Sequence, residues 1–379
     1  MPLELLKIYN GRNLIEYTLK PHPLFNIIYG SNGAGKTTIL ESIYLLLRSR
    51  TFRSSKYKSF INHDAVDCTI FSLFSSHKTP DFESSFTLGI NRSRNFSQPV
   101  IHLDSKKINS LSTITKLVIL GLITPDSFTL LDAGPSIRRK FIDWGVFHVE
   151  HDFLSDWRAY KKILSSRNIL LSKFSKEFKL NKKLTPDKIR RLDCWTPQLT
   201  QLNNKLDTYR TNQIKNITPF FIDYIKCFSE SLGNEITLEY YQGWNKEMKY
   251  EDFLNEKFSE DLIAGFTRYG SHRGELKIKF TKYLAKDILS RGQKKIIIIC
   301  LILAQFKFLV QEDSDNAHNL LLLDDIDSEL DESNLLILFN ILRTFKSQIL
   351  VTTTNNEKFN FLDIKEHKMF HVEHNKDSS

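Results

Sequence analysis

The chain has few cysteines, no long hydrophobic run and no low-complexity tract. Its 379 residues include only four cysteines, which are Cys68, Cys194, Cys227 and Cys300. They lack the spacing of a zinc site or a disulfide framework, which favours a protein of the reducing cytosol. The longest apolar stretch, residues 296–303, is typical of a buried helix and too short to span a membrane. The first residues lack the charged and apolar regions of a secretion signal. We therefore expect a cytoplasmic protein without a membrane partner.

Acidic residues are fewer than basic ones, 44 against 53, and the net charge is +9. This excess is either diffuse solubilising charge or the mark of a polyanionic partner, most simply nucleic acid. Basic residues also cluster at 138–140, 182–183 and 190–191. Such clusters are what a surface that follows phosphates requires, so we predict DNA as a partner. The candidate contacts lie in one stretch that has no acidic residue: Arg48, Arg50, Arg53, Lys56 and Lys58.

Residues 30–37 fit the phosphate-binding pattern G-x-x-x-x-G-K-[ST] and are here called the P-loop. A short apolar run precedes them and apolar residues at helical spacing follow, so the pattern stands between a predicted strand and a predicted helix. The inward N–H groups of such a loop and the N-terminus of its helix bind phosphate. Lys36 is predicted to reach the β- and γ-phosphates of ATP as a catalytic residue, and the Thr37 hydroxyl to bind Mg²⁺. The predicted nucleotide contacts are Gly30, Ser31, Asn32, Gly33, Ala34, Gly35, Lys36, Thr37 and Thr38.

Four leucines at 320–323 end in two carboxylates, Asp324 and Asp325. A buried parallel strand presents such side chains at its carboxyl end, where ligands bind in α/β sheets. We predict that Asp324 holds Mg²⁺ opposite Thr37. Asp325 is predicted to face the γ-phosphate and to polarise the attacking water as a catalytic residue.

Residues 288–295 form a third motif, in which Ser290 suits a helix N-cap and Gly292 permits close backbone approach. With the P-loop before it and the acidic strand after it, the order is that of an ATP-binding-cassette (ABC) ATPase. In that class the third motif is called the signature, and the signature of one subunit closes on the γ-phosphate held by the other. Ser290, Gly292 and Gln293 are therefore predicted nucleotide contacts, and ATP is predicted to hold a dimer that hydrolysis releases.

The remaining patterns predict an α/β fold. Residues 3–8 and 14–19 are expected to pair as strands, and 67–102 to form an antiparallel meander. Residues 138–231 are mostly helical, with breaks expected near Pro197 and Pro219, and a strand returns at 235–240. We predict an ABC-type P-loop ATPase head from residues 1–125 and 266–379, with a mainly helical lobe, 126–265, inserted between them.

Over nearly its whole length the chain resembles the bacterial RecF family of SMC/Rad50-like ATPases. The P-loop continues into residues 40–44 and 50–53 as in that family, and 134–143 is similar to its Arg-Arg motif. Arg167 and Asn168 are similar to its helical Arg-Asn pair. Residues 289–293 resemble its form of the signature, and 323–325 with 328–331 its acidic strand and following loop.

This resemblance implies a slow, DNA-dependent ATPase that acts in DNA repair, replication and the SOS response. It implies an ATP-dependent homodimer that, with RecO and RecR, promotes loading of the recombinase RecA at gapped or stalled DNA. Asp331 would contact the partner subunit's nucleotide, and Thr353 or Thr354 would lie near the γ-phosphate. The chain departs from the family pattern at Gly11, and again at Ser271 and Gly274.

Three other classes share part of the motif set. An ABC transporter motor needs a membrane partner and lacks a helical lobe of this size. A longer-armed SMC or Rad50 protein needs hundreds of heptad residues between the two halves of the head. A P-loop kinase or GTPase would use Asp324 but leave residues 290–293 without a role.

Overall fold

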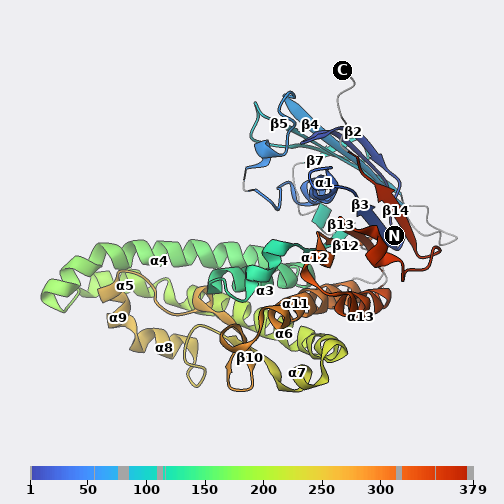
Figure 1. Ribbon diagram of the computed structural model, residues 1–379. Helices are drawn as coiled ribbons and strands as arrows, with labels where there is room; N and C mark the ends of the chain where they lie inside the picture. The colour runs from blue at the N-terminus through green and yellow to red at the C-terminus, as the bar shows by residue number, and fades with distance from the viewer. Residues whose placement is uncertain are drawn as a thin grey trace, which may run out of the picture. The chain divides into compact units, whose positions relative to one another are not determined.

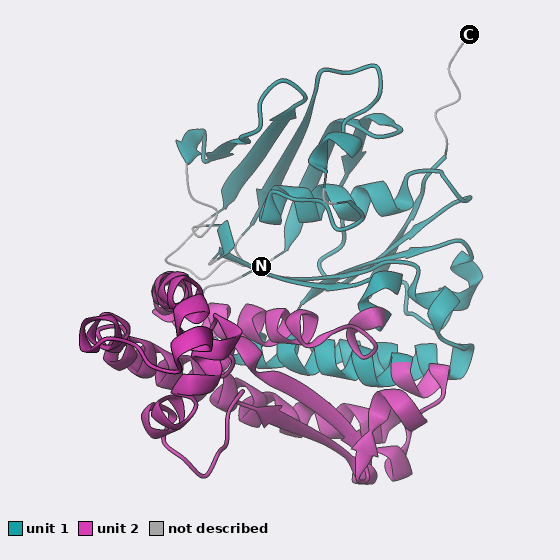
Figure 2. Cartoon of the chain, turned by 90° about the vertical axis from the view of Figure 1, so that its left-hand side faces the viewer, with its two compact units in different colours: residues 1–128, 295–379 teal, residues 129–294 magenta. Residues whose placement is uncertain are grey.

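The computed structural model describes residues 2–54, 56–75, 85–108, 114–115, 117–312, 318–345 and 347–373. The chain divides into two compact units (Figure 2). Unit 1 contains Met1–Phe128 and Lys295–Ser379, and unit 2 contains Thr129–Lys294. The two ends of the chain thus share one unit, and the middle of the chain forms the other.

Unit 1 contains a five-stranded, all-parallel sheet in the order β14-β3-β13-β12-β8. Its central strands are almost completely buried and mostly apolar, as expected for strands covered on both faces. Val351 lies opposite both Ile27 and Leu323, so three neighbouring strands end at one edge of the sheet. The strands are β3 (Phe25–Tyr29), β8 (Val118–Ile123), β12 (His318–Leu323), β13 (Gln348–Thr353) and β14 (His367–His371).

A six-stranded antiparallel sheet completes unit 1, in the order β2-β1-β4-β5-β6-β7. It confirms the predicted pairing of the first two strands and the predicted meander. Helix α1 (Lys36–Arg48) contacts strands of both sheets, and its apolar side chains join their common core (Figure 1). The strands are β1 (Leu3–Gly11), β2 (Leu14–Leu19), β4 (Asp67–Phe74), β5 (Phe86–Ser93), β6 (Val100–Leu103) and β7 (Lys106–Ile108).

Further helices of unit 1 lie in its C-terminal part. The predicted buried helix is α11 (Arg291–Glu312), whose first turn belongs to unit 2 and whose apolar remainder belongs to unit 1. None of the helices in the described residues is long and apolar enough to cross a membrane. The remaining elements are α12 (Ile326–Glu329), α13 (Glu332–Arg343) and the 3₁₀ turns η1 (Tyr57–Ser59), η2 (Pro125–Leu130), which crosses into unit 2, and η4 (Asn356–Phe359).

Unit 2 is mainly helical and is built on two long helices that pack together, α4 (Phe153–Asn181) and α6 (Thr196–Phe228) (Figure 1). The buried apolar residues of α4 include Phe153, Tyr160 and Ile163. Shorter helices surround this pair: α3 (Pro135–Val149), α5 (Pro186–Asp193), α7 (Glu230–Glu235), α8 (Tyr250–Glu256), α9 (Phe258–Ala264), α10 (Ala285–Ile288) and the 3₁₀ turn η3 (Ser271–Arg273).

A small antiparallel sheet extends unit 2 beyond residue 265, where the sequence placed the end of the helical lobe. Strand β9 (Ile236–Tyr241), the strand predicted near 235–240, pairs with β10 (Glu275–Phe280), which pairs with β11 (Tyr283–Leu284). Because these hydrogen bonds join segments on both sides of residue 265, the compact unit continues to Lys294.

The expected helix break near Pro219 is wrong, because α6 continues through this residue. Pro197 lies in the first turn of α6, where a missing N–H costs nothing. Pro219 lies inside the helix and removes one hydrogen bond. Ile217 and Phe221 on either side of it are completely buried, and this packing offsets the lost bond.

Candidate nucleotide-binding site

The glycine loop follows β3 and leads directly into α1. Gly35 has a φ of +114° and Gly30 a φ of +156°, a region that other residues rarely adopt. A Cβ atom on Gly30 would lie 2.2 Å from the carbonyl oxygen of Val372. The strand-to-helix connection therefore requires glycine at these positions, and it matches the predicted context of the P-loop.

Lys36 is buried, and its ammonium group points back into the loop. Its Nζ donates hydrogen bonds to the carbonyl oxygens of Gly30 and Ser31, both at 2.9 Å. A positive charge and the N-terminus of α1 are thus located together at the loop. This arrangement suits a phosphate group.

Thr37 and Asp324 lie side by side, although they are far apart in the sequence. The Thr37 hydroxyl donates to Asp324 Oδ1 at 2.9 Å, and the Thr352 hydroxyl donates to the same oxygen at 2.8 Å. Burial raises the pKa of Asp324, while the two hydroxyl groups lower it. A hydroxyl and a carboxylate in contact are the hard oxygen ligands that Mg²⁺ prefers, so the donor set fits the predicted ion.

Asp325 begins the turn after β12 in the left-handed conformation, with a φ of 49°. Its backbone N–H donates to the Thr352 hydroxyl at 2.9 Å. Burial raises the pKa of its carboxyl group, the neighbouring Asp324 raises it further, and Lys36 lowers it. An Asp held in this uncommon conformation beside the P-loop is consistent with a functional role.

Asp325 and the P-loop line one cavity of about 640 Å³ in unit 1. Several lining residues were not predicted, because they come from the β1–β2 turn and the segment after η1 and carry no recognisable motif. Two of them contact the P-loop region directly: Asn13 donates to the Gly33 carbonyl at 3.0 Å, and Arg12 pairs with the buried Glu41 of α1 at 2.8 Å. The lining is Arg12, Asn13, Asn32, Gly33, Gly35, Lys36, Thr37, Thr38, Arg53, Ser59, Ile61, Asn62, His63, Asp64 and Asp325.

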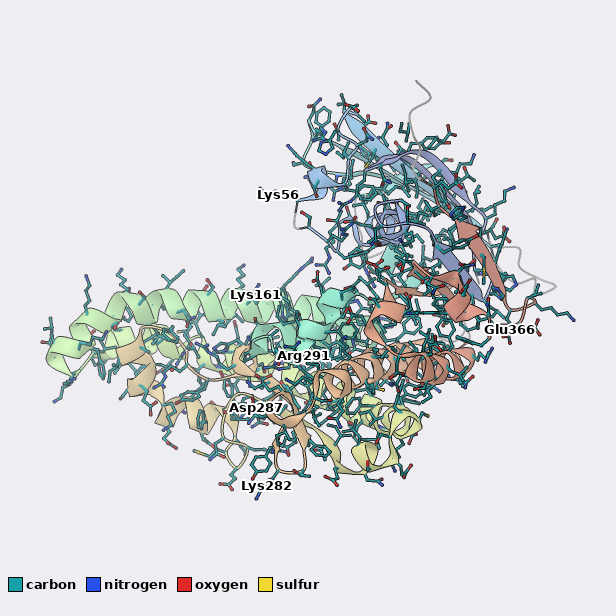
Figure 3. The ribbon with its side chains drawn as sticks, in the orientation of Figure 1. Lys56, Lys161, Lys282, Asp287, Arg291 and Glu366 are labelled. Atoms are coloured by element: carbon teal, nitrogen blue, oxygen red, sulfur yellow. The ribbon has the colours of Figure 1, made fainter. Side chains whose placement is uncertain are left out.

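The five predicted DNA contacts do not share one environment. Arg53 lines the nucleotide cavity. Arg48 is half-buried on α1, and burial lowers the pKa of its guanidinium to about 10. Arg50, Lys56 and Lys58 are exposed, and Figure 3 shows Lys56 on an outer edge of unit 1. Arg53 is exposed as well, so four of the five have the exposure that a DNA-binding surface needs, and Arg48 does not.

The predicted signature forms the start of α11. The Gln293 N–H donates to the Ser290 hydroxyl at 3.3 Å, and the Ser290 N–H donates to Gln293 Oε1 at 3.0 Å. This reciprocal pair is a capping box, which satisfies two N–H groups at the helix start. Ser290, Gly292 and Gln293 are exposed and belong to unit 2, whereas the cavity lining belongs to unit 1.

Asp331 and Thr353 have clear structural partners. Asp331 is the N-cap of α13 and accepts hydrogen bonds from the Asn334 N–H and the Ser333 hydroxyl, which lower its pKa. Thr353 is buried and donates to Asp327 at 2.8 Å, whereas Thr354 is exposed.

The paired Arg motifs also make contacts inside unit 2. Arg138 forms an ion pair with Glu275 at 2.7 Å. Arg167 is almost completely buried and pairs with Asp261 at 2.8 Å. Asn168 accepts a hydrogen bond from the backbone of Thr267. These residues hold the lobe together.

Comparison with known proteins agrees with this arrangement. Residues 2–378 match the family described as the RecF/RecN/SMC N terminal domain. The chain is 34% identical to the DNA replication and repair protein RecF of Stutzerimonas stutzeri, over 99% of this chain and 96% of that protein. It is also 34% identical to the protein of that name from Aliivibrio fischeri strain MJ11, over 99% of both chains.

Solved structures show the same fold. The recombination mediator protein RecF with ATP, in the RecFOR pathway, superposes with a TM-score of 0.78 at 25% identity, over 98% of this chain and 95% of that one. An SMC head bound to a domain of ScpA superposes with a TM-score of 0.54 at 15% identity, over 98% of this chain and 94% of that one, and supports the fold alone. The α/β head fold is therefore confirmed, and the chain belongs to the RecF family.

Proposed function

We propose that this chain is an ATP-dependent DNA-binding protein of the cytoplasm that acts in DNA repair, replication and the SOS response. In this proposal it promotes RecA loading at gapped or stalled DNA together with RecO and RecR. The names of its relatives support this: two are DNA replication and repair proteins, and a similar solved structure is a recombination mediator with ATP.

The observation that carries the ATPase part is the contact of Thr37 and Thr352 with Asp324 at the ends of three neighbouring strands. Thr37 and Asp324 would hold Mg²⁺, which when bound neutralises charge on the phosphate oxygens. Lys36 would exchange its carbonyl partners for phosphate oxygens. Asp325, whose pKa is raised, would orient and polarise the attacking water.

We further propose that the site is completed by a second copy of the chain. The signature is exposed at the start of a 22-residue helix, whose N-terminus favours an anion. A Cβ added to Gly292 would meet nothing within 4 Å, so one subunit by itself does not require glycine there. A phosphate approaching from another subunit would explain it. Ser290, Gly292 and Gln293 would then contact the partner's nucleotide, with Asp331 beside them.

Size-exclusion chromatography of Asp325→Asn tests this proposal, because the variant should bind ATP without hydrolysing it. We expect a monomer without nucleotide and a dimer with Mg²⁺-ATP. Lys36→Ala is the control and should remain monomeric in both conditions. An Asp325→Asn protein that binds ATP and stays monomeric would contradict the dimer and leave an enzyme with a complete site in one subunit.

A further inference from the structure

The outer face of α4 carries a row of cations that the nucleotide site does not use. At 100° per residue, these side chains lie within about 60° of one line along the helix. All of these side chains are exposed. They are here called the α4 basic face, which consists of Arg158, Lys161, Lys162, Lys173, Lys176 and Lys179. Figure 3 shows side chains near Lys161 pointing away from the other helices of unit 2.

No acidic side chain offsets this charge on the same face. Of the two carboxylates of α4, Asp156 is buried and pairs with Lys205 at 3.3 Å. Glu177 lies beside the face and forms an ion pair with Lys188 of α5. Within the described residues, none of the cations of the α4 basic face pairs with a carboxylate. The face therefore presents uncompensated positive charge.

The middle of the face is uncharged and shallowly hollowed. Ser165, Ile169 and Ser172 continue the same line between the two groups of cations. They help to line a hollow of about 590 Å³, together with Lys161, Leu164, Asn168 and Gly265. Two exposed hydroxyl groups in a hollow between cations can approach and hydrogen-bond a phosphate backbone.

The dimensions and the residue types favour double-stranded DNA. From Arg158 to Lys179 the helix rises about 32 Å, close to the roughly 34 Å of one turn of B-form DNA. Binding of single strands usually requires aromatic side chains on which bases stack. Among the aromatic residues of α4, Trp157 lies closest to this face by helical angle; it is half-buried, and the Lys161 ammonium lies 4.3 Å from its ring centroid.

We infer that the α4 basic face binds the phosphate backbone of duplex DNA without reading its sequence. This inference rests on the proposed DNA-binding function and names a surface for it in unit 2. The sequence-predicted contacts Arg50, Lys56 and Lys58 belong to unit 1. The contacts are electrostatic, so they must weaken as salt rises.

The test uses the full-length triple variant Lys173→Gln, Lys176→Gln, Lys179→Gln. Its matched control is Lys215→Gln, Lys249→Gln, Lys282→Gln, which removes the same charge from other exposed sites of unit 2. Figure 3 shows Lys282 at the tip of a hairpin, away from α4. Unchanged ATP affinity and circular dichroism establish that both variants are folded.

Binding to a 30-base-pair duplex is measured with Mg²⁺-ATP between 50 and 200 mM salt. In the α4 variant we expect affinity to fall about tenfold or more at 0.1 M salt, and the log–log salt slope to decrease by about 2–3. The control should stay close to wild type. Equal losses in both variants, or no loss in either, would overturn the inference.

Further measurements distinguish failure of this inference from failure of the proposed DNA-binding function. If the wild type does not bind duplex even with ATP, the proposed DNA-binding function fails together with this inference. If the wild type binds duplex and the α4 variant binds equally well, only the inference fails. An equal or larger loss on a thirty-nucleotide oligo-dT would contradict the duplex assignment. Loss of binding to polyglutamate with unchanged duplex binding would assign the face to an acidic protein instead.

Discussion

At the scale of single residues, Arg53 shows how position changes the meaning of a charge. In the sequence it is one of five cations predicted to contact DNA. In the structure it lines the nucleotide cavity with Lys36 and Asp325, whereas Lys58, which is exposed like Arg53, does not belong to the lining. A guanidinium in a phosphate site provides charge-assisted hydrogen bonds.

Arg53→Gln is therefore expected to weaken ATP binding about tenfold to a hundredfold, since a hydrogen bond to a charged group contributes about 1.5–3 kcal/mol. Titration with a fluorescent ATP analogue measures this change. Lys58→Gln is the control and should bind ATP as the wild type does. Equal ATP affinity in both variants would show that Arg53 makes no contact with the nucleotide.

Asp207 on α6 is a second residue with a perturbed environment. Burial raises the pKa of its carboxyl group to about 6, against opposing effects of Arg210 and Lys246. Its Oδ1 is buried without a hydrogen-bond partner in the described part of the chain. Because the pKa of Asp207 in the folded protein lies above the ordinary value of 3.8, its neutral carboxyl group contributes to the stability of the fold. This contribution is complete below pH 3.8 and is lost as pH rises through about 6.

Asp207→Asn should therefore melt above the wild type at pH 7.5, and this difference in Tm should shrink as pH is lowered to 5. Thermal melts followed by circular dichroism across that range measure it. Asp223→Asn, at an exposed position of the same helix, should show no such trend. A constant difference at every pH would contradict the predicted titration.

At the scale of elements, the start of α11 combines a structural task with a proposed functional one. Ser290 caps the helix through its bonds with Gln293, and removing such a cap costs about 1 kcal/mol. The same turn is exposed and is proposed to meet the nucleotide of a partner subunit. A useful substitution must separate these two tasks.

Ser290→Arg should abolish ATP-dependent dimerisation while the monomer keeps its affinity for ATP, because the P-loop is intact. Ser290→Thr keeps a capping hydroxyl and is expected to dimerise. Light scattering with Mg²⁺-ATP compares the two variants in the Asp325→Asn background. Loss of ATP affinity in the Ser290→Arg monomer would place the signature in the same subunit's site.

At the scale of the whole molecule, the proposed dimer contains two sites, each with Lys36 from one subunit and Ser290 from the other. Lys36→Ala and Ser290→Arg should each be inactive when assayed alone. In a mixed dimer one of the two sites receives both intact residues, because a symmetric interface uses each surface once per site.

Because neither variant is expected to dimerise by itself, every dimer in an equal mixture is mixed and holds one intact site, so the mixture should recover up to about half of the wild-type ATPase rate. Phosphate release measures this recovery. Doubly mutated subunits that carry both changes serve as the control and should stay inactive. Absence of any recovery, with mixed dimers present, would argue against a shared site.

Much of the fold and the centre of the site could be predicted from local patterns. The glycine loop, the leucine run before Asp324 and the long apolar helix of α11 depend on residue type and period over short stretches. The break expected at Pro219 failed, because burial of neighbouring side chains in a long packed helix outweighed the local preference of proline.

The sequence by itself determined the chemistry of the phosphate-binding loop and of the acidic strand, because both are encoded by neighbouring residues. Only the tertiary structure decided which distant groups join them. The strand order places β13 between β3 and β12, which brings Thr352 to Asp324. Chain folding also brings Arg12 and Arg53 to the cavity. Contacts between segments far apart in the chain follow from sheet order and packing, which no local pattern contains.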